Sequence, residues 1–221
     1  MFFSFLILPI FLVLGYYYRV LDTATHGMIN GDDKLPKFDD LTSMFVDGLK
    51  VFLVKFIYLL IPCIIFLASL IIGGQISGLN NNVGSGVMFV GIIISIILAI
   101  LFYFLSIMAV SNMVANNGSI KDAFDYKSIW KIISNVGWLR YIGFYLGLII
   151  IITVISIIVG IILALIWITL GISGAFVSAF GLNIGLIIGL LITISVYLFL
   201  ISPYLTIFES RAIGLIYEPL D

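Results

Sequence analysis

The side chains best suited to metal or acid–base chemistry are gathered in one short stretch of the chain. Residues 26–40 hold the only histidine, His26, and four aspartates, Asp32, Asp33, Asp39 and Asp40. Carboxylates and an imidazole are acceptable ligands for a divalent cation, so a membrane-associated metal-dependent hydrolase is one hypothesis. The spacing of these residues matches no metal-ligand motif, which makes this hypothesis the weakest of those considered below.

Each of these acids also has a structural interpretation. Asp39 or Asp40 caps a helix that begins at Leu41, because acids are favoured at the positive end of a helix dipole. The pair Asp32 and Asp33 follows Asn-Gly, which is typical of a turn. The only cysteine, Cys63, lies in an apolar run and cannot form an intramolecular disulfide. We therefore predict no catalytic, cofactor-binding or metal-binding residue and no cofactor, and expect that the chain is not an enzyme.

The composition indicates an all-α integral membrane protein. Of 221 residues, 63% are hydrophobic and only 10% are charged, and the mean hydropathy is +1.32. Soluble domains are about 45–50% apolar and about 25% charged. A soluble fold of this size would lack the polar residues needed to cover its surface, whereas a lipid solvent removes that requirement. The net charge of −1 gives no indication of a nucleic-acid partner.

Hydropathy predicts a single membrane domain, residues 1–221, with about five transmembrane helices. A span needs about 20 apolar residues. The predicted spans are residues 2–18, 51–72, 87–111, 141–170 and 184–208. The first is short, but no Lys or Arg precedes it and no small-residue cleavage site follows it, so it is interpreted as a retained helix rather than a signal peptide.

All ten basic residues fall in the segments that five spans place on one side of the bilayer. They are Arg19, Lys34, Lys37, Lys50, Lys55, Lys121, Lys127, Lys131, Arg140 and Arg211. The other two loops, 73–86 and 171–183, carry no charge of either sign. The positive-inside rule then predicts a multi-pass protein of the cell membrane with its amino terminus outside and its carboxyl terminus in the cytoplasm.

Two of the charged segments have the apolar spacing of amphipathic helices, at about 40–50 and 119–134. The first runs into the second span. In the second, Ser119 and Asp122 resemble a capping box, and Lys127 and Lys131 share a face that could meet phosphate headgroups. Each amphipathic helix precedes a pair of spans joined by an uncharged loop. The chain is therefore expected to contain two units, each an amphipathic helix plus a helical hairpin, after a short first span.

The polar groups within the spans argue against ion-coupled transport. No ionisable side chain lies near mid-membrane, where transporters commonly bury one. Lys55 lies little more than one turn into its span and can extend back to the headgroups. Glycines repeat every four residues at Gly143 and Gly147, and at Gly181, Gly185 and Gly189, which indicates close helix packing within the chain or, alternatively, self-association.

Short motifs distributed along the chain are similar to those of a known family. They are Gly15-Tyr16-Tyr17-Tyr18-Arg19-Val20-Leu21, Leu35-Pro36-Lys37-Phe38-Asp39-Asp40, Asp47-Gly48-Leu49-Lys50, Ile57-Tyr58 with Pro62, Gly118-Ser119, Ala123-Phe124, Gly137-Trp138-Leu139-Arg140-Tyr141 and Arg211-Ala212-Ile213-Gly214-Leu215-Ile216-Tyr217. In this order they resemble the archaeal multi-pass membrane family called domain of unknown function 4013. The resemblance implies an archaeal source, a multi-pass topology and a natural start upstream of Met1, and it implies no activity.

Three functional hypotheses remain from the sequence. The leading one is a non-catalytic scaffold or subunit whose ordered cytoplasmic face engages a protein partner or a second copy of the chain, with the lipid bilayer as its constant partner. The alternatives are a lipid or small-solute permease built on the two units, and the metal-dependent hydrolase described above.

Overall fold

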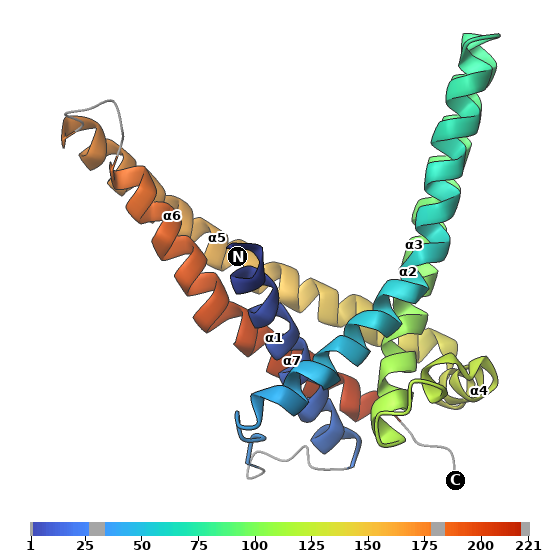
Figure 1. Cartoon of the computed structure of the whole chain (residues 1–221), viewed down its shortest axis with the longest axis horizontal. Coiled ribbons are helices and arrows are strands. Elements are labelled where there is room, and N and C mark those ends of the chain that lie inside the picture. The colour runs from blue at the N-terminus through green and yellow to red at the C-terminus, as the bar shows by residue number, and fades with distance from the viewer. Residues whose placement is uncertain (1, 27–33, 178–183, 218–221) are drawn as a thin grey trace. The chain divides into compact units, whose positions relative to one another are not determined.

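The computed structural model describes residues 2–26, 34–177 and 184–217, and helices account for nearly all of them (Figure 1). The elements in order are α1 (Phe2–Thr25), α2 (Leu41–Ser77), α3 (Asn81–Ala115), the 3-10 turn η1 (Asp122–Phe124), α4 (Tyr126–Val136), α5 (Trp138–Val177), α6 (Ile184–Val196), the π-helical turn η2 (Tyr197–Ile201) and α7 (Ser202–Ile216). The chain divides into unit 1, Met1–Val136 with Ile213–Asp221, and unit 2, Gly137–Ala212. The predicted all-α fold is confirmed for the described residues.

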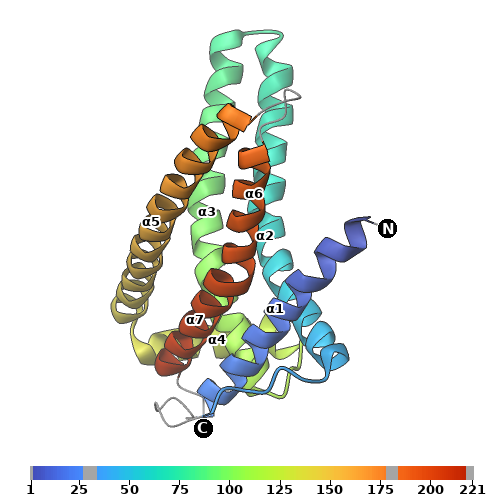
Figure 2. The same ribbon diagram turned by 90° about the vertical axis from the view of Figure 1, so that its left-hand side faces the viewer.

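Unit 1 is built on a long antiparallel hairpin of α2 and α3. The two helices run side by side in both views (Figures 1 and 2). Their turn is short because Asn80 caps α3 with its own side chain, whose Oδ1 accepts from the backbone amides of Asn82 and Val83. Helix α1 packs against both helices of the hairpin, and η1 and α4 pack against α3.

The predicted helix start at Leu41 is confirmed, and Asp40 is its cap. Helix α2 begins at Leu41, and the Asp40 Oδ1 accepts a hydrogen bond of 3.3 Å from the amide of Ser43. The amphipathic turns and the apolar span form one uninterrupted helix of 37 residues. The sequence therefore specifies both the start of α2 and its continuation into the apolar region.

The second amphipathic segment differs from its prediction over 119–134. Residues 119–125 form turns and η1, and the helix α4 begins only at Tyr126. The cap is Asp125 rather than Ser119, because the Asp125 Oδ1 accepts from the amides of Lys127 and Ser128. Helix α4 then ends before Gly137, whose φ of +90° is a conformation that glycine adopts without strain. This break separates α4 from α5, whereas α2 is continuous.

Unit 2 contains the second hairpin, formed by α5 and α6. The indole Nε1 of Trp167 on α5 donates to the Thr193 Oγ1 on α6 at 2.7 Å, which joins the two apolar helices by a side-chain hydrogen bond. Beyond α6 the helical path passes through η2 directly before Pro203. A proline lacks an amide hydrogen and its ring clashes with the carbonyl four residues earlier, so a local widening of the helix accommodates it.

Three helices of the described chain are long and apolar enough to span a membrane, fewer than the five predicted. They are Leu41–Ser77, Asn81–Ala115 and Trp138–Leu170. The predicted span 184–208 is not among them, because the π-helical turn η2 divides it into α6, with 13 residues, and the start of α7. The predicted span 2–18 is the start of α1, which continues to Thr25 and carries Arg19 and Asp22 in its packed second half.

Candidate functional site

The buried side chains of unit 1 gather where the hairpin meets α1, η1, α4 and the end of α7. We call this part of unit 1, residues 16–26, 34–58, 106–136 and 213–217, the charged end. Its buried residues include Tyr17, Val20, Leu21, Met44, Val51, Val54, Tyr58, Ile107, Met108, Met113, Ile129, Ile132, Ile133, Ile213 and Tyr217. The hairpin beyond it exposes most of its large apolar side chains. The charged end is thus a compact core, whereas the hairpin presents apolar surface to its surroundings.

Arg19 on α1 holds the segment that leads into α2. Its guanidinium donates to the backbone carbonyls of Lys37 at 3.0 Å, Asp39 at 2.7 Å and Asp40 at 3.4 Å. It also donates to the Asp39 Oδ1 at 3.1 Å and the Ser43 Oγ at 2.7 Å. A guanidinium presents several donors in a rigid planar fork, which suits this set of acceptors. Arg19 therefore fixes residues 37–43 against α1.

Asn112, near the end of α3, joins three separate parts of the charged end. Its Nδ2 donates to the Asp122 carbonyl at 2.8 Å, and its Oδ1 accepts from the Tyr217 hydroxyl at 3.2 Å and from the Asn116 Nδ2 at 3.2 Å. Burial raises the pKa of Tyr217 to about 12, so its hydroxyl stays protonated and can donate. Asn112 directly follows the predicted span 87–111, and the sequence gives no indication of these partners.

The predicted metal-site residues are not brought together among the described residues. Asp39 binds Arg19 and Asp40 caps α2, while His26 lies beside Asp22, with 3.5 Å between its Nδ1 and the Asp22 Oδ1. No group of three potential His, Cys, Asp or Glu ligands occurs in residues 2–26, 34–177 and 184–217. Asp32 and Asp33 lie outside these ranges.

A titratable cluster that sequence reasoning missed lies between α1 and α2. Burial raises the pKa of the Asp22 carboxyl, the His26 ring opposes this rise, and the Asp47 carboxylate adds to it. Asp47 in turn lies 3.6 Å from the Lys50 Nζ. The cluster therefore places a second carboxylate, Asp47, near the Asp22 carboxyl, with the His26 ring beside Asp22 and the Lys50 ammonium beside Asp47.

The side chain of Lys55 on α2 contacts a tyrosine ring on α1. Its Nζ lies 4.7 Å from the centre of the Tyr17 ring, a cation–π geometry. Tyr17 is buried in the α1 face of the charged end. The ammonium of Lys55 is therefore directed toward α1.

Helix α4 has two clearly different faces. Ile129, Ile132 and Ile133 are buried and Lys127, Lys131 and their aromatic neighbours are exposed. The Asp125 that caps α4 has a pKa below its usual value because the Ser128 hydroxyl and amide donate to its carboxylate. The predicted common face of Lys127 and Lys131 is confirmed.

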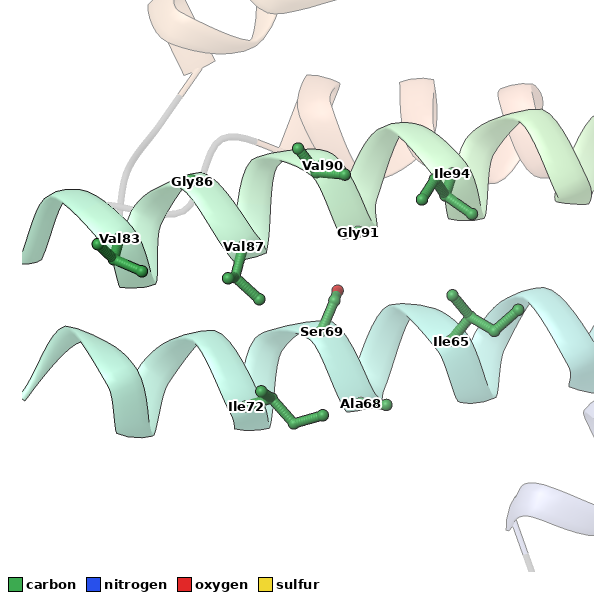
Figure 3. A pocket seen from close by; sticks show the side chains of 10 residues that line it. All are labelled: Ile65, Ala68, Ser69, Ile72, Val83, Gly86, Val87, Val90, Gly91 and Ile94. Carbon is green, nitrogen blue, oxygen red and sulfur yellow. The ribbon is translucent and has the colours of Figure 1, made fainter.

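A shallow apolar groove lies between α2 and α3 in the part of the hairpin beyond the charged end (Figure 3). It encloses about 620 Å³ and is lined by Ile65, Ala68, Ser69, Ile72, Val83, Gly86, Val87, Val90, Gly91 and Ile94. The hydroxyl of Ser69 is its one polar side-chain group, and it donates to the Phe66 carbonyl within its own helix. The groove can therefore accept hydrocarbon but offers no charged or strongly polar contact.

Two of the glycine positions predicted to pack closely are open. A Cβ added at Gly143 or Gly147 would have no atom within 4 Å, whereas one at Gly189 would lie 3.5 Å from the Trp167 ring. Gly181 lies outside the described residues. A close backbone approach lies instead in unit 1, where Gly15 of α1 and Gly48 of α2 face each other's helices.

The long apolar helices, their exposed apolar surface and the compact charged end define an α-helical protein suited to a lipid bilayer. The chain belongs to the family whose model is described as Protein of unknown function (DUF4013), which matches residues 2–164. The resemblance inferred from its motifs is confirmed by this match. No curated protein and no solved structure matches the chain.

Proposed function

We propose that this protein is a non-catalytic membrane scaffold or subunit whose charged end binds a protein partner or a second copy of the chain. The observation that carries the proposal is the location of the core. The buried side chains concentrate at the charged end, so this end is held in a defined shape while the hairpins supply apolar surface for the bilayer. Arg19 and Asn112 add hydrogen bonds that fix the surface segments of this end.

The charged end also presents apolar side chains suited to a protein contact. Leu35, Phe38 and Leu41 are exposed on the segment that Arg19 holds against α1. An apolar patch on an ordered surface is typical of an interaction site. Its chemistry fits an apolar surface of a partner protein better than a small charged substrate.

The proposal is tested by purification in mild detergent followed by native mass spectrometry. We expect a stoichiometric partner or a homo-oligomer with the natural chain, and its loss with Phe38→Ser. Leu79→Ser is the matched control, because Leu79 is exposed at the opposite end of the α2–α3 hairpin. A monomer under several mild conditions, or equal loss with both variants, would contradict the proposed interface.

We further propose that the charged end lies in the cytoplasm of a cell-membrane protein, following the distribution of Lys and Arg. Cysteines introduced by Asn82→Cys and Lys121→Cys in a Cys63→Ala background should be labelled from opposite sides, because both positions are exposed and lie at opposite ends of unit 1. An impermeant reagent added outside intact cells should reach position 82 but not position 121. Labelling of position 121 alone would reverse the orientation.

A lipid or small-solute permease is the second candidate, and the groove between α2 and α3 is the observation in its favour. Its lining is apolar, so the expected cargo would be an acyl chain rather than an ion. Purified protein reconstituted in liposomes should then exchange a labelled lipid between leaflets. An exchange rate equal to that of protein-free liposomes would remove this candidate.

A further inference from the structure

A contact between η1 and the hairpin fixes the depth of α4 along unit 1. The Tyr58 hydroxyl on α2 donates to the Ala123 carbonyl in η1 at 2.9 Å. The Tyr58 ring stacks on Phe124 at 5.6 Å between ring centres, and it also approaches the Phe102 ring of α3 at 6.2 Å. The 3-10 turn that precedes α4 is thus held at the level of Tyr58 and Phe102.

This level lies one bilayer thickness from the hairpin turn. At about 1.5 Å per residue, α2 rises about 28 Å from Tyr58 to Ser77 and α3 about 32 Å from Asn81 to Phe102. The hydrocarbon core of a bilayer is about 30 Å thick. The sequence between residues 56 and 120 contains no charged side chain, and the far turn is polar at Asn80 to Asn82. A bilayer spanned by this hairpin therefore has one boundary at the level of η1, where α4 begins.

The outer face of α4 combines the two residue types that favour a membrane boundary. Tyr126 and Trp130 are exposed to 54% and 60% and are separated by one helical turn. Lys127 and Lys131 form a second exposed ridge beside them. Aromatic rings of this kind concentrate at the membrane–water interface, and lysines there attract anionic headgroups. The opposite face, with Ile129, Ile132 and Ile133, is already packed in the core.

The local charge favours an anionic partner. Asp125, the acid closest to the two lysines in sequence, binds the amides of Lys127 and Ser128 and the Ser128 hydroxyl. Its carboxylate is therefore hydrogen-bonded to the cap of α4, and the two exposed lysines outnumber it. At the depth set by Tyr58, the anions that surround this face are the phosphates of lipid headgroups.

We propose that the outer face of α4 lies in the headgroup layer and binds anionic phospholipid, with Lys127 and Lys131 on the phosphates and Tyr126 and Trp130 between the headgroups. This face is separate from the patch of Leu35, Phe38 and Leu41, so the proposal does not rest on the scaffold function. It requires only that the hairpin spans a bilayer.

The experiment uses Trp130 as a fluorescent reporter in the full chain. Trp138→Phe and Trp167→Phe leave Trp130 as the sole tryptophan. The protein is reconstituted in vesicles with equal amounts of phosphatidylglycerol and phosphatidylcholine, of which one or the other carries a nitroxide near the headgroup. We expect quenching by both labelled lipids and stronger quenching by labelled phosphatidylglycerol. Lys127→Gln with Lys131→Gln should lower this preference by about 25-fold, because each of the two cations at a membrane surface contributes about fivefold.

The matched control is Lys34→Gln with Lys37→Gln, which removes two exposed lysines elsewhere on the charged end and should leave the preference unchanged. Quenching by aqueous iodide without quenching by lipid would overturn the proposal and place this face in water, where a protein partner would be its occupant. Equal quenching by the two lipids would overturn the anionic specificity. If the double Phe background loses its helical circular dichroism, Tyr126→Cys with Cys63→Ala, labelled with an environment-sensitive dye, gives the same comparison.

Discussion

Gly48→Ala is expected to destabilise the protein by about 3 kcal/mol, the upper end of the usual cost of overpacking, although the same change in a helix normally stabilises by about 1 kcal/mol. The reason is the crossing of α1 and α2. A Cβ at Gly48 would collide with the Phe11 carbonyl oxygen and would lie 2.8 Å from the Gly15 amide nitrogen. A Cβ at Gly15 would collide with the Met44 carbonyl oxygen. The two backbones are therefore in direct contact.

The neighbours at this crossing cannot move aside as a flexible side chain would. They are backbone atoms of α1, and the Phe11 ring beside them is held in edge contacts with Phe45 at 5.2 Å and Phe52 at 5.4 Å. A methyl group at position 48 must therefore push the helices apart. Separation would loosen the packing of α1 along α2, including the ring contacts of Phe11.

Unfolding in a titration from mild detergent into sodium dodecyl sulfate, followed by circular dichroism, measures this effect. Gly86→Ala is the matched control, because a Cβ added at Gly86 on α3 would have no atom within 4 Å. The control should be neutral or stabilising by up to about 1 kcal/mol. A Gly48→Ala variant as stable as Gly86→Ala would show that α1 and α2 do not approach as closely as their glycines allow.

The glycines show which close helix contacts can be predicted from the sequence and which cannot. Gly143 and Gly147 were predicted to pack closely because small residues four apart form a local pattern, yet these positions are open. Gly15 and Gly48 lie on different helices and form no pattern in either one. Their importance arises from a tertiary crossing, which a single sequence does not encode in its local spacing.

The same distinction between local and tertiary information holds for the other elements. Asp40 was recognisable as a cap because the capping interaction involves residues three apart, and the apolar runs specify long helices directly. The start of α4 was misplaced because Ser119 and Asp125 are both good caps. The Tyr58 hydroxyl donates to the carbonyl of Ala123, 65 residues away in sequence. This contact is made by η1, which directly precedes the Asp125 cap, so it accompanies a helix that begins after Asp125. The link from Asn112 to Tyr217, separated by 105 residues, is likewise visible only in the fold.

Arg19→Lys is the second change with a large expected effect, about 2–3 kcal/mol, because hydrogen bonds from a charged donor contribute about 1.5–3 kcal/mol each and a lysine can replace only part of the set. Three of the five bonds go to backbone carbonyls, those of Lys37, Asp39 and Asp40. The lysine ammonium retains the charge but not the planar fork that reaches several carbonyls at once. We therefore expect residues 37–43 to detach from α1 while the hairpin remains folded.

Hydrogen–deuterium exchange of the amides at the start of α2 measures this detachment directly, since the Ser43 amide is capped by Asp40 within the same segment. Asp39→Asn is the informative comparison. The Asp39 side chain is 66% exposed, so its ion pair with Arg19 should contribute less than about 1 kcal/mol. Rapid exchange in Arg19→Lys with near-natural exchange in Asp39→Asn would identify the carbonyl contacts as the stabilising ones. Equal exchange in the two variants would assign the effect to the ion pair instead, and the segment would then depend on ionic strength, as exposed ion pairs do.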